Sequence, residues 1–367
     1  MKLVFAIKAL SVPGGGAERV FVDIANGLHA RGHDLQVMTF EPAASGSFYD
    51  LDASIPRLDS GVSKITKATQ LLSLPRVRSR ILAAKPDAVV AFMPSCYVPL
   101  AAALVFSGVP FIASEHNVPA RYKSQPLSWL SMKAASCFAT RFTAVSDQMK
   151  RQYPEIVQRK MTVLPNPVDI VADAQADVVG APGQGRIIAV GRLHEQKDHI
   201  TLIRAFAKLA DEFPGWTVRI LGDGAERDRL RQEISRHNLD GRVELPGTVR
   251  DVGAEYRAAQ IYVIPSRYES YGLATIEALA HGLPAVGFAD CPGTNELIRD
   301  DVNGVLVYPD DDRAGRLADA MKRLMADADA RCRLAVGPLD SQEHSLFSIL
   351  DRWEYLLGDA KWHETGM

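Results

Sequence analysis

The sequence has few of the features that mark small secreted or metal-binding proteins. It contains only four cysteines among 367 residues, and they are far apart: Cys96, Cys137, Cys291 and Cys332. With no Cys-x-x-Cys pair, this spacing argues against a zinc ribbon or a disulfide framework and indicates buried thiols in a reducing compartment.

Long apolar runs are also scarce. Residues 88–114 carry no charge over 27 positions, and a transmembrane helix needs about 20 apolar residues. Three prolines and Gly108 interrupt this stretch, which favours a buried strand, a helix and a second buried strand over a membrane span. The N-terminal MKLVFAIKAL is interrupted by Lys8 and predicts a first strand rather than a signal peptide.

Several catalytic motifs are missing. There is no GxSxG, no GxxxxGK[ST] and no basic helix-turn-helix pattern, which disfavours hydrolase, NTPase and DNA-binding functions. His194, Glu195 and His199 are spaced HExxxH, so both imidazoles do not share the helical face that a zinc protease needs. The acids at 310–312 precede an amphipathic stretch and are typical of a helix N-cap and first turn. We expect no required metal and no cofactor.

Charge is unevenly distributed. The net charge is −2, but residues 62–160 hold 14 Lys and Arg against 4 Asp and Glu, a net +10 that leaves −12 elsewhere. This asymmetry indicates that the first domain faces an anionic partner, either a membrane surface or a lipid-phosphate substrate. A merely solvated basic face is the alternative.

Strand-like and helix-like segments alternate along the whole chain. Alternation of this kind predicts βαβ units and parallel sheets, and 367 residues suit two domains. We expect an α/β protein with two Rossmann-like doubly wound domains that place the ligand at the carboxyl ends of their strands. The predicted division is a first domain at 1–168, a linker at 169–186, a second domain at 187–342 and a helical segment at 343–367. The sequence pattern leaves open whether this segment packs on the first domain or on the second.

Gly14, Gly15 and Gly16 follow the first predicted strand and run into a helix. Glycines there let the backbone approach a phosphate at a helix start. A dinucleotide site is the rival, with Glu41 as the ribose-binding acid, but Arg19 stands where GxGxxG needs its last glycine. A plain glycine-rich turn is the third alternative.

Two other polar groups follow predicted strands. Glu115, His116 and Asn117 end a buried strand of the first half, where His116 could donate a hydrogen bond or carry a proton; a structural histidine is the alternative. Arg192 and Lys197 follow the first strand of the second half, and two fixed cations beside a helix start can neutralise a diphosphate.

The segment SRYESYGLATIEALAHGLPAVGF, residues 266–288, predicts a turn, a helix from about Gly272 and a stop at Gly282-Leu283-Pro284 before the next strand. The helix start offers unpaired N–H groups to phosphate or sugar hydroxyls. Glu269 lies in the turn, and Glu277 lies on an apolar helix where a buried carboxylate needs a donor. A ribose diol would supply two donors; a bond within the protein is the alternative.

Taken together and in order, GGGAERV, SEHN, PNPVD, VGRLHEQKD, LGDGAERDRL, LPGTVRD, ESYGLATIEALAHGLPAV and NGVLV resemble retaining nucleotide-sugar glycosyltransferases of family 4. The resemblance covers nearly the whole chain and is nearest to bacterial enzymes of surface-polysaccharide, lipopolysaccharide or lipid-linked oligosaccharide synthesis. It implies the GT-B fold, with the acceptor held mainly by the first domain and the donor mainly by the second. It also implies a cytoplasmic protein that is peripheral at the inner face of the plasma membrane. A nucleic-acid partner is not expected.

The resemblance assigns roles to individual residues. The catalytic set is His116, Arg192, Lys197 and Glu269, and Arg121 joins Glu115 and Asn117 as acceptor-side candidates. The donor-binding set is Gly15, Gly16, Gly191, Arg192, Lys197, Gly222, Gly224, Thr248, Val249, Tyr271, Gly272, Leu273 and Glu277. One departure is CPGTNEL at 291–297, where many members have a longer glycine-rich turn, so Thr294 and Glu296 receive no role.

The expected reaction is transfer of a hexose or N-acetylhexosamine with retention, from a UDP-sugar in preference to GDP-mannose. Double displacement would need a second carboxylate about 5 Å away, and only Glu269 is available, so we expect front-face attack. An epimerase on the same scaffold and a non-catalytic nucleotide-sugar-binding protein are the alternatives.

Overall fold

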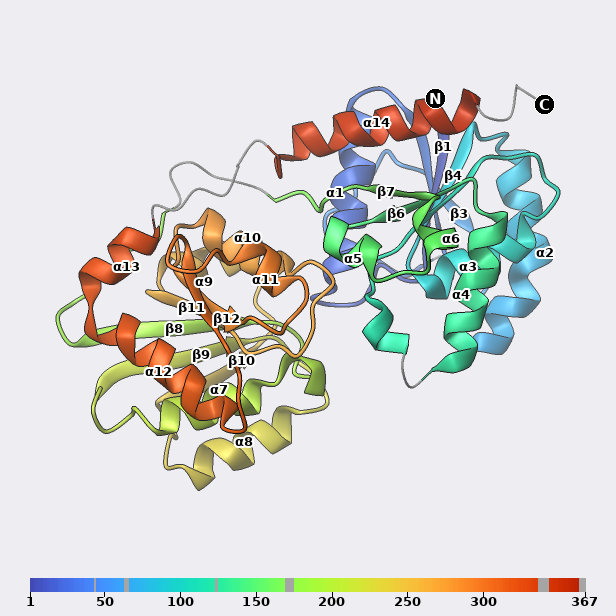
Figure 1. The fold of residues 1–367 in the computed structure, drawn as a ribbon. Helices are drawn as coiled ribbons and strands as arrows, with labels where there is room; N and C mark the ends of the chain where they lie inside the picture. The colour runs from blue at the N-terminus through green and yellow to red at the C-terminus, as the bar shows by residue number, and fades with distance from the viewer. Residues whose placement is uncertain (43, 63–65, 123–124, 169–174, 336–342, 363–367) are drawn as a thin grey trace. The chain divides into compact units, whose positions relative to one another are not determined.

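The computed structural model describes residues 1–42, 44–62, 66–122, 125–168, 175–335 and 343–362. The chain forms two compact units, the first made of Met1–Pro167 with Glu343–Met367 and the second of Val168–Gln342. Each unit is a parallel sheet with helices on its faces (Figure 1). The prediction of two Rossmann-like α/β domains is confirmed.

The first sheet has the order β3-β2-β1-β4-β5-β6-β7, with every pair parallel. Its strands are β1 (Lys2–Ile7), β2 (Asp34–Thr39), β3 (Arg57–Asp59), β4 (Ala88–Phe92), β5 (Phe111–Ser114), β6 (Arg141–Ala144) and β7 (Met161–Val163). Its helices are α1 (Gly16–Ala30), α2 (Lys67–Ala83), α3 (Pro94–Ala103), η1 (Pro119–Tyr122), α4 (Pro126–Phe138), α5 (Asp147–Arg151), α6 (Glu155–Gln158) and α14 (Leu346–Trp362).

The second sheet has the order β10-β9-β8-β11-β12-β13, again with every pair parallel. Its strands are β8 (Gln184–Val190), β9 (Gly215–Leu221), β10 (Val243–Gly247), β11 (Ile261–Ile264), β12 (Ala285–Phe288) and β13 (Gly304–Val307). Its helices are η2 (Glu195–Lys197), α7 (His199–Ala207), α8 (Arg227–Arg236), α9 (Val252–Arg257), α10 (Leu273–Ala280), α11 (Thr294–Leu297), α12 (Arg313–Ala326) and α13 (Ala328–Ala335).

The strands are apolar because both faces of each sheet are covered. All five residues of β4 are buried, and in β8 Ile187 and Ala189 join one apolar cluster while Ile188 joins another. Successive side chains of a strand point to opposite faces, so each sheet has a core on both sides. This is the reason why parallel strands appear as continuous apolar runs in the sequence.

The strand order of each sheet reverses at one position, and this position determines where ligands bind. The reversal lies between β1 and β4 in the first unit and between β8 and β11 in the second. In open parallel sheets, ligands bind beyond the carboxyl ends of the strands at such a switch point. Residues that follow β8 and β11 are therefore expected to meet.

The uncharged stretch 88–114 forms β4, α3 and β5, as predicted from its prolines and glycine. No helix among the described residues is long and apolar enough to cross a bilayer.

The expected linker ends sooner than predicted. Residues 169–174 lie outside the described part of the chain, but β8 already begins at Gln184, and the amide of Ala176 donates to the carbonyl of His281 at 2.8 Å. Arg331 also donates to the carbonyl of Val178 at 2.6 Å. The described part of this segment is therefore packed on the second unit.

Helix α14 resolves the choice left open by its sequence pattern. It belongs to the first unit, where it contacts α1 and β4 (Figure 1). The chain thus returns to the first unit after completing the second.

Candidate functional site

The loop after β8 positions the two predicted cations. Lys197 ends η2, and its side chain packs over Gly191, because a Cβ added to Gly191 would lie 3.0 Å from the Cε of Lys197. A side chain at position 191 would thus press on the lysine stem. Arg192, on the same loop, is exposed.

Glu269 lies in the turn after β11 and meets Lys197 across the switch point. Its Oε1 accepts a bond from Lys197 Nζ at 2.6 Å and from Ser266 Oγ at 2.6 Å. The two charged side chains are only 15% and 8% exposed. Two residues predicted separately, 72 positions apart, are thus brought together in a largely buried ion pair.

A neighbouring loop fixes the backbone of Glu269. The amide of Glu269 donates to the carbonyl of Pro292 at 2.9 Å. Gly293 has φ +81, and a Cβ there would lie 2.7 Å from the carbonyl oxygen of Glu269. Thr294 is fully buried and accepts a bond from the Cys291 thiol at 3.3 Å. The CPGTNEL segment, whose role the sequence left open, therefore supports the turn that carries Glu269.

Helix α10 begins at the same edge of the sheet. Gly272, its N-cap, has φ +76, a left-handed conformation that favours glycine. The first in-helix bonds run from the amides of Thr275 and Ile276 to the carbonyl of Gly272, so the amides of Leu273 and Ala274 precede the helical ladder and are available to an anion. Tyr271 is buried beside them.

Glu277 lies one turn into α10 and is 8% exposed. The prediction that its carboxylate must meet a donor is satisfied within the protein, because the Tyr256 hydroxyl of α9 is 3.1 Å from its Oε2. The same hydroxyl is 3.1 Å from the carbonyl of Ala274. Tyr256 has one proton to share between these two acceptors.

Gly222 and Gly224, two glycines of the predicted donor-binding set, allow two loops to pack together. Gly222 has φ +132, and a Cβ there would lie 2.1 Å from the carbonyl oxygen of Gly191; at Gly224 it would lie 2.3 Å from that of Leu193. The amide of Leu193 donates to the carbonyl of Asp223 at 2.9 Å. These glycines therefore shape the loop that carries Arg192. Thr248 and Val249 follow β10 at the same edge of the sheet, where Thr248 is exposed and Val249 half-buried.

In the first unit, the glycine-rich turn does not present an open helix start. Gly15 is the N-cap of α1 and Gly16 its first residue, but a Cβ on Gly15 would lie 2.0 Å from the Oε2 of Glu18. The Glu18 carboxylate therefore covers the end of the helix where the sequence analysis expected a phosphate. A bound anion at Gly15 would need this side chain to move.

Glu41 has a structural role. It is 3% exposed and accepts bonds from the amides of Leu10 at 2.6 Å and Ser11 at 3.2 Å. These bonds fix the loop after β1 rather than leaving the carboxylate for a ribose. The geometry thus argues further against a dinucleotide site.

His116 follows β5, half-buried. Its ring stacks on Phe92 at 5.2 Å with an interplanar angle of 19°, and its Nε2 lies 3.0 Å from Ser114 Oγ, which accepts a bond from Thr143 Oγ1 at 2.9 Å. Burial lowers the pKa of His116 to about 4, so the imidazole is neutral near pH 7. A neutral imidazole carries one N–H donor and one acceptor nitrogen, so beside its contact with Ser114 the ring has a second nitrogen that can bind a hydroxyl group.

Glu115 is not available to an acceptor, which corrects its prediction as an acceptor-side residue. It is fully buried and accepts bonds from the Tyr97 hydroxyl, from the Tyr122 hydroxyl at 2.9 Å and from the Asn117 amide at 2.8 Å. Burial raises the pKa of this carboxyl. A carboxylate with three internal donors, placed directly before His116, stabilises the loop rather than binding substrate.

The other two acceptor-side candidates differ in exposure. Asn117 is 8% exposed, and its carbonyl accepts a bond from the Tyr153 hydroxyl at 2.5 Å. Arg121, in η1, is exposed. Of the three candidates, only Arg121 presents its side chain to solvent.

The described residues contain no cluster of three or more His, Cys, Asp or Glu that could hold a metal ion. Asp312 is the N-cap of α12, as predicted, and accepts a bond from the Gly315 amide at 2.8 Å. The Nδ1 of His194 accepts a bond from the Gln196 amide and caps η2. His199 instead lies in α7 and is buried, and this burial lowers its pKa to about 3. The two imidazoles of HExxxH thus have separate structural roles.

The structure adds residues that the sequence analysis missed. Ser266 bonds Glu269, Tyr256 bonds Glu277, and Pro292 bonds the backbone of Glu269. Ser266 ends a predicted strand next to the turn, and this position could have marked it. Tyr256 and Pro292 reach the site only through the packing of α9 and the α11 loop.

Comparisons with known proteins cover both units of the chain. A family model described as Glycosyltransferase Family 4 matches residues 14–171, and one described as Glycosyl transferases group 1 matches residues 184–327. An α-1,4-N-acetyl-D-galactosaminyltransferase of Campylobacter jejuni, named for a diphosphate-linked undecaprenol saccharide, is 26% identical over 98% of this chain and 99% of its own length. The lipopolysaccharide core biosynthesis glycosyltransferase LpsE of Rhizobium meliloti is 28% identical over 88% of each chain.

The fold has solved counterparts. The structure of Anabaena HepE in complex with UDP and glucose aligns with a TM-score of 0.82 and 24% identity, covering 98% of this chain and 99% of that one. HepE has also been solved with UDP-glucose, and that structure aligns with a TM-score of 0.81.

Proposed function

Because this chain is a glycosyltransferase of the GT-B fold, with a family 4 domain followed by a group 1 domain, we propose that it is a retaining, metal-independent enzyme of surface-glycan biosynthesis. It moves a hexose or N-acetylhexosamine from a UDP-sugar to a saccharide or lipid-linked acceptor. The observation that carries this proposal is the ion pair of Lys197 and Glu269 beside the start of α10, at the switch point of the second sheet.

Donor binding follows from the positions of the charges. Arg192 is exposed, and Lys197 lies close by on the same loop. The guanidinium group of Arg192 and the ammonium group of Lys197 can therefore both bind the donor diphosphate. The amides at the start of α10 add an anion-binding end of a helix dipole. Glu277 holds the ribose hydroxyls, supported from behind by Tyr256.

Glu269 supports a front-face reaction. Its Oε1 already accepts bonds from Lys197 and Ser266, and a carboxylate neutralised in this way is a weak nucleophile. The transfer then proceeds through an oxocarbenium-like state, and the acceptor attacks on the same face of the sugar from which the diphosphate departs. The anomeric configuration is therefore retained. Lys197, Arg192 and the helix start stabilise the departing diphosphate. In the first unit, the imidazole of His116 binds a substrate hydroxyl.

The names of related proteins support the choice of substrates. HepE has been solved with UDP and with UDP-glucose, which favours a UDP-sugar over GDP-mannose. The Campylobacter jejuni relative is named for a diphosphate-linked undecaprenol acceptor, which favours a lipid-linked acceptor and agrees with the net +10 of residues 62–160. That basic segment is proposed to face an anionic membrane surface.

A thermal-shift screen of nucleotide sugars tests the donor. Binding to the folded state raises the midpoint of unfolding, so UDP-sugars should raise Tm more than GDP-mannose does. A larger shift with GDP-mannose would overturn the choice of base. Incubation of the preferred donor in EDTA, with and without a lipid-linked acceptor, then separates the activities: a transferase needs the acceptor, an epimerase does not, and a binding protein gives no product.

A further inference from the structure

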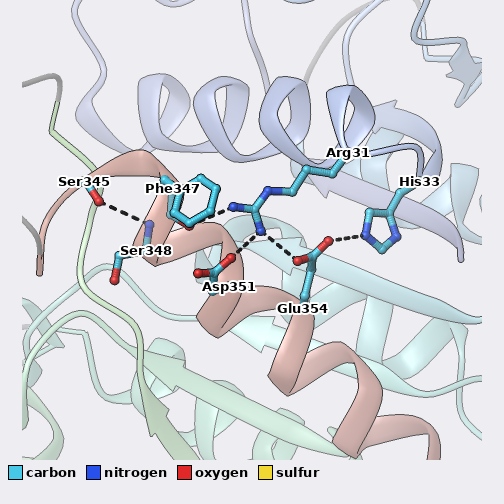
Figure 2. A network of polar contacts seen from close by, with 7 residues as sticks. All are labelled: Arg31, His33, Ser345, Phe347, Ser348, Asp351 and Glu354. Carbon is cyan, nitrogen blue, oxygen red and sulfur yellow. Dashed lines mark hydrogen bonds and ion pairs between the residues drawn. The ribbon is translucent and has the colours of Figure 1, made fainter.

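Helix α14 is held on the first unit by a polar network (Figure 2). Arg31, just after α1, donates to Asp351 at 2.6 Å, to Glu354 at 2.7 Å and to the carbonyl of Phe347 at 3.0 Å. The Nε2 of His33 lies 2.9 Å from the other oxygen of Glu354. These contacts fix the rotation of α14 about its axis, and Trp353, directly before Glu354 in sequence, is buried.

Trp353 is 2% exposed and packs into the aromatic core of the first unit. Its ring lies 6.1 Å from that of Phe5 and stacks on Phe92 at 5.9 Å with an interplanar angle of 18°. The indole Nε1 has no hydrogen-bond partner among the described residues. The indole therefore acts through packing, and a phenyl ring in its place would remove no hydrogen bond.

Phe92 joins Trp353 to the site. It is the last residue of β4 and is fully buried, and it stacks with His116 at 5.2 Å and 19°. Trp353, Phe92 and His116 are thus nearly parallel rings linked in series, at the carboxyl end of β4 and β5. The imidazole has one fixed hydrogen bond, to Ser114, so the ring plane depends on its aromatic neighbour.

We propose that Trp353 is a positioning residue, which sets the orientation of the His116 imidazole through Phe92. The segment that follows the second unit in sequence thereby completes the site of the first. This inference rests on the role of His116 in the proposed function, and it adds a residue 237 positions away that does not touch the substrate.

The test compares Trp353→Leu, Trp353→Phe and Leu357→Ala in the full chain. Leu357 is a fully buried residue of α14, so its truncation weakens the packing of the helix without removing the aromatic stack. Trp353→Leu is expected to lower kcat roughly tenfold while the donor KM stays nearly constant, because a misplaced group impairs the reacting geometry more than binding. Trp353→Phe should restore most of kcat, and Leu357→Ala should lower Tm while keeping kcat.

Two readouts separate positioning from general destabilisation. The imidazole proton resonances of His116, assigned with His116→Ala, should shift in Trp353→Leu without any substrate present and stay in place in Leu357→Ala. The double variant Trp353→Leu/His116→Ala should have the kcat of His116→Ala within about twofold, since a residue that acts through another adds nothing once its target is gone.

Unmoved His116 resonances in Trp353→Leu, or a double variant much slower than His116→Ala, would overturn the positioning role. If Trp353→Leu does not fold, Trp353→Met takes its place, because it also removes the ring but fills more of the space; the same resonances and kcat are then expected to change. Resonances that move while kcat stays constant in Trp353→Leu and in His116→Ala would instead overturn the role of His116 in the proposed function.

Discussion

Replacing Lys197 by methionine separates the stabilising role of the lysine from its catalytic role. Lys197→Met retains most of the side-chain stem over Gly191 but leaves the carboxylate of Glu269, which is 8% exposed, with Ser266 as its remaining side-chain donor. Removing one partner of a buried ion pair destabilises a protein by about 3–5 kcal/mol. For a unit of this size, 1 kcal/mol corresponds to about 2–4 °C, so the midpoint of the second unit should fall by roughly 6–20 °C.

The double variant Lys197→Met/Glu269→Gln removes both charges. The neutral amide can keep its bond to Ser266, so at least half of the lost stability should return, as expected when a whole buried pair is replaced. Transfer should stay about 10²–10³-fold below wild type in both variants, because the cation that stabilises the departing diphosphate is missing from each.

Calorimetry and a radiolabelled transfer assay measure the two effects. Lys208→Met is the matched control, because Lys208 pairs with Asp312 at 3.2 Å on the surface of the same unit, with side chains 51% and 63% exposed. Such pairs contribute about 0–1 kcal/mol, so this variant should keep both Tm and activity. An unchanged Tm in Lys197→Met would contradict the stabilising role of Lys197, and a double variant that recovers transfer would contradict its catalytic role.

Other parts of both units can be tested in the same way. Glu277→Gln should weaken UDP binding in calorimetry by about 1.5–3 kcal/mol, the contribution of a charge-assisted hydrogen bond, and normal affinity would contradict a ribose role. Gly222→Ala should lower the denaturant midpoint far more than Gly241→Ala, since an added Cβ meets the carbonyl of Gly191 at 2.1 Å in the first case and nothing within 4 Å in the second; equal effects would show that the loops need no close approach. The pKa of His199 is about 3 in the folded protein and ordinarily 6.5, so as the pH drops from about 6.5 towards 4 the unfolded chain binds a proton that the folded protein does not, and Tm falls. His199→Leu should reduce this dependence of Tm on pH, and an unaltered dependence would exclude His199 as its source. Sedimentation with vesicles should show binding to anionic but not neutral lipid, weakened by salt, and equal binding to both would remove the basic segment as a membrane surface.

Local sequence patterns were sufficient to predict much of the fold. Prolines and a glycine placed β4, α3 and β5 within one uncharged stretch. Gly282 ends α10 with φ +73, and the amide of Leu283 closes the helix on the carbonyl of Ala278 at 3.0 Å, as the Gly-Leu-Pro sequence predicts. Helix α2 continues through Pro75, which a rule that ends helices at proline would not predict.

The candidate site could be predicted only in part, since its contacts join residues far apart in sequence. Lys197 and Glu269 were each identified from their place after a strand, but their ion pair follows from the neighbouring positions of β8 and β11 in the sheet. Glu115 was misassigned because no local pattern reveals the Tyr97 and Tyr122 hydroxyls that surround it. Glu18 was overlooked for a simpler reason: a first-turn glutamate can fold back over its own helix start, and only coordinates show that it does.

The anomeric configuration of the product shows whether the enzyme is a retaining glycosyltransferase, as proposed. The purified protein is incubated in EDTA with the UDP-sugar that raises its Tm most and an undecaprenyl-diphosphate-linked saccharide, and the new linkage is read by proton NMR. An α-linked product from an α-linked UDP-sugar is the predicted result. A β-linked product, or transfer that appears only when a divalent metal is restored, would contradict a retaining, metal-independent glycosyltransferase.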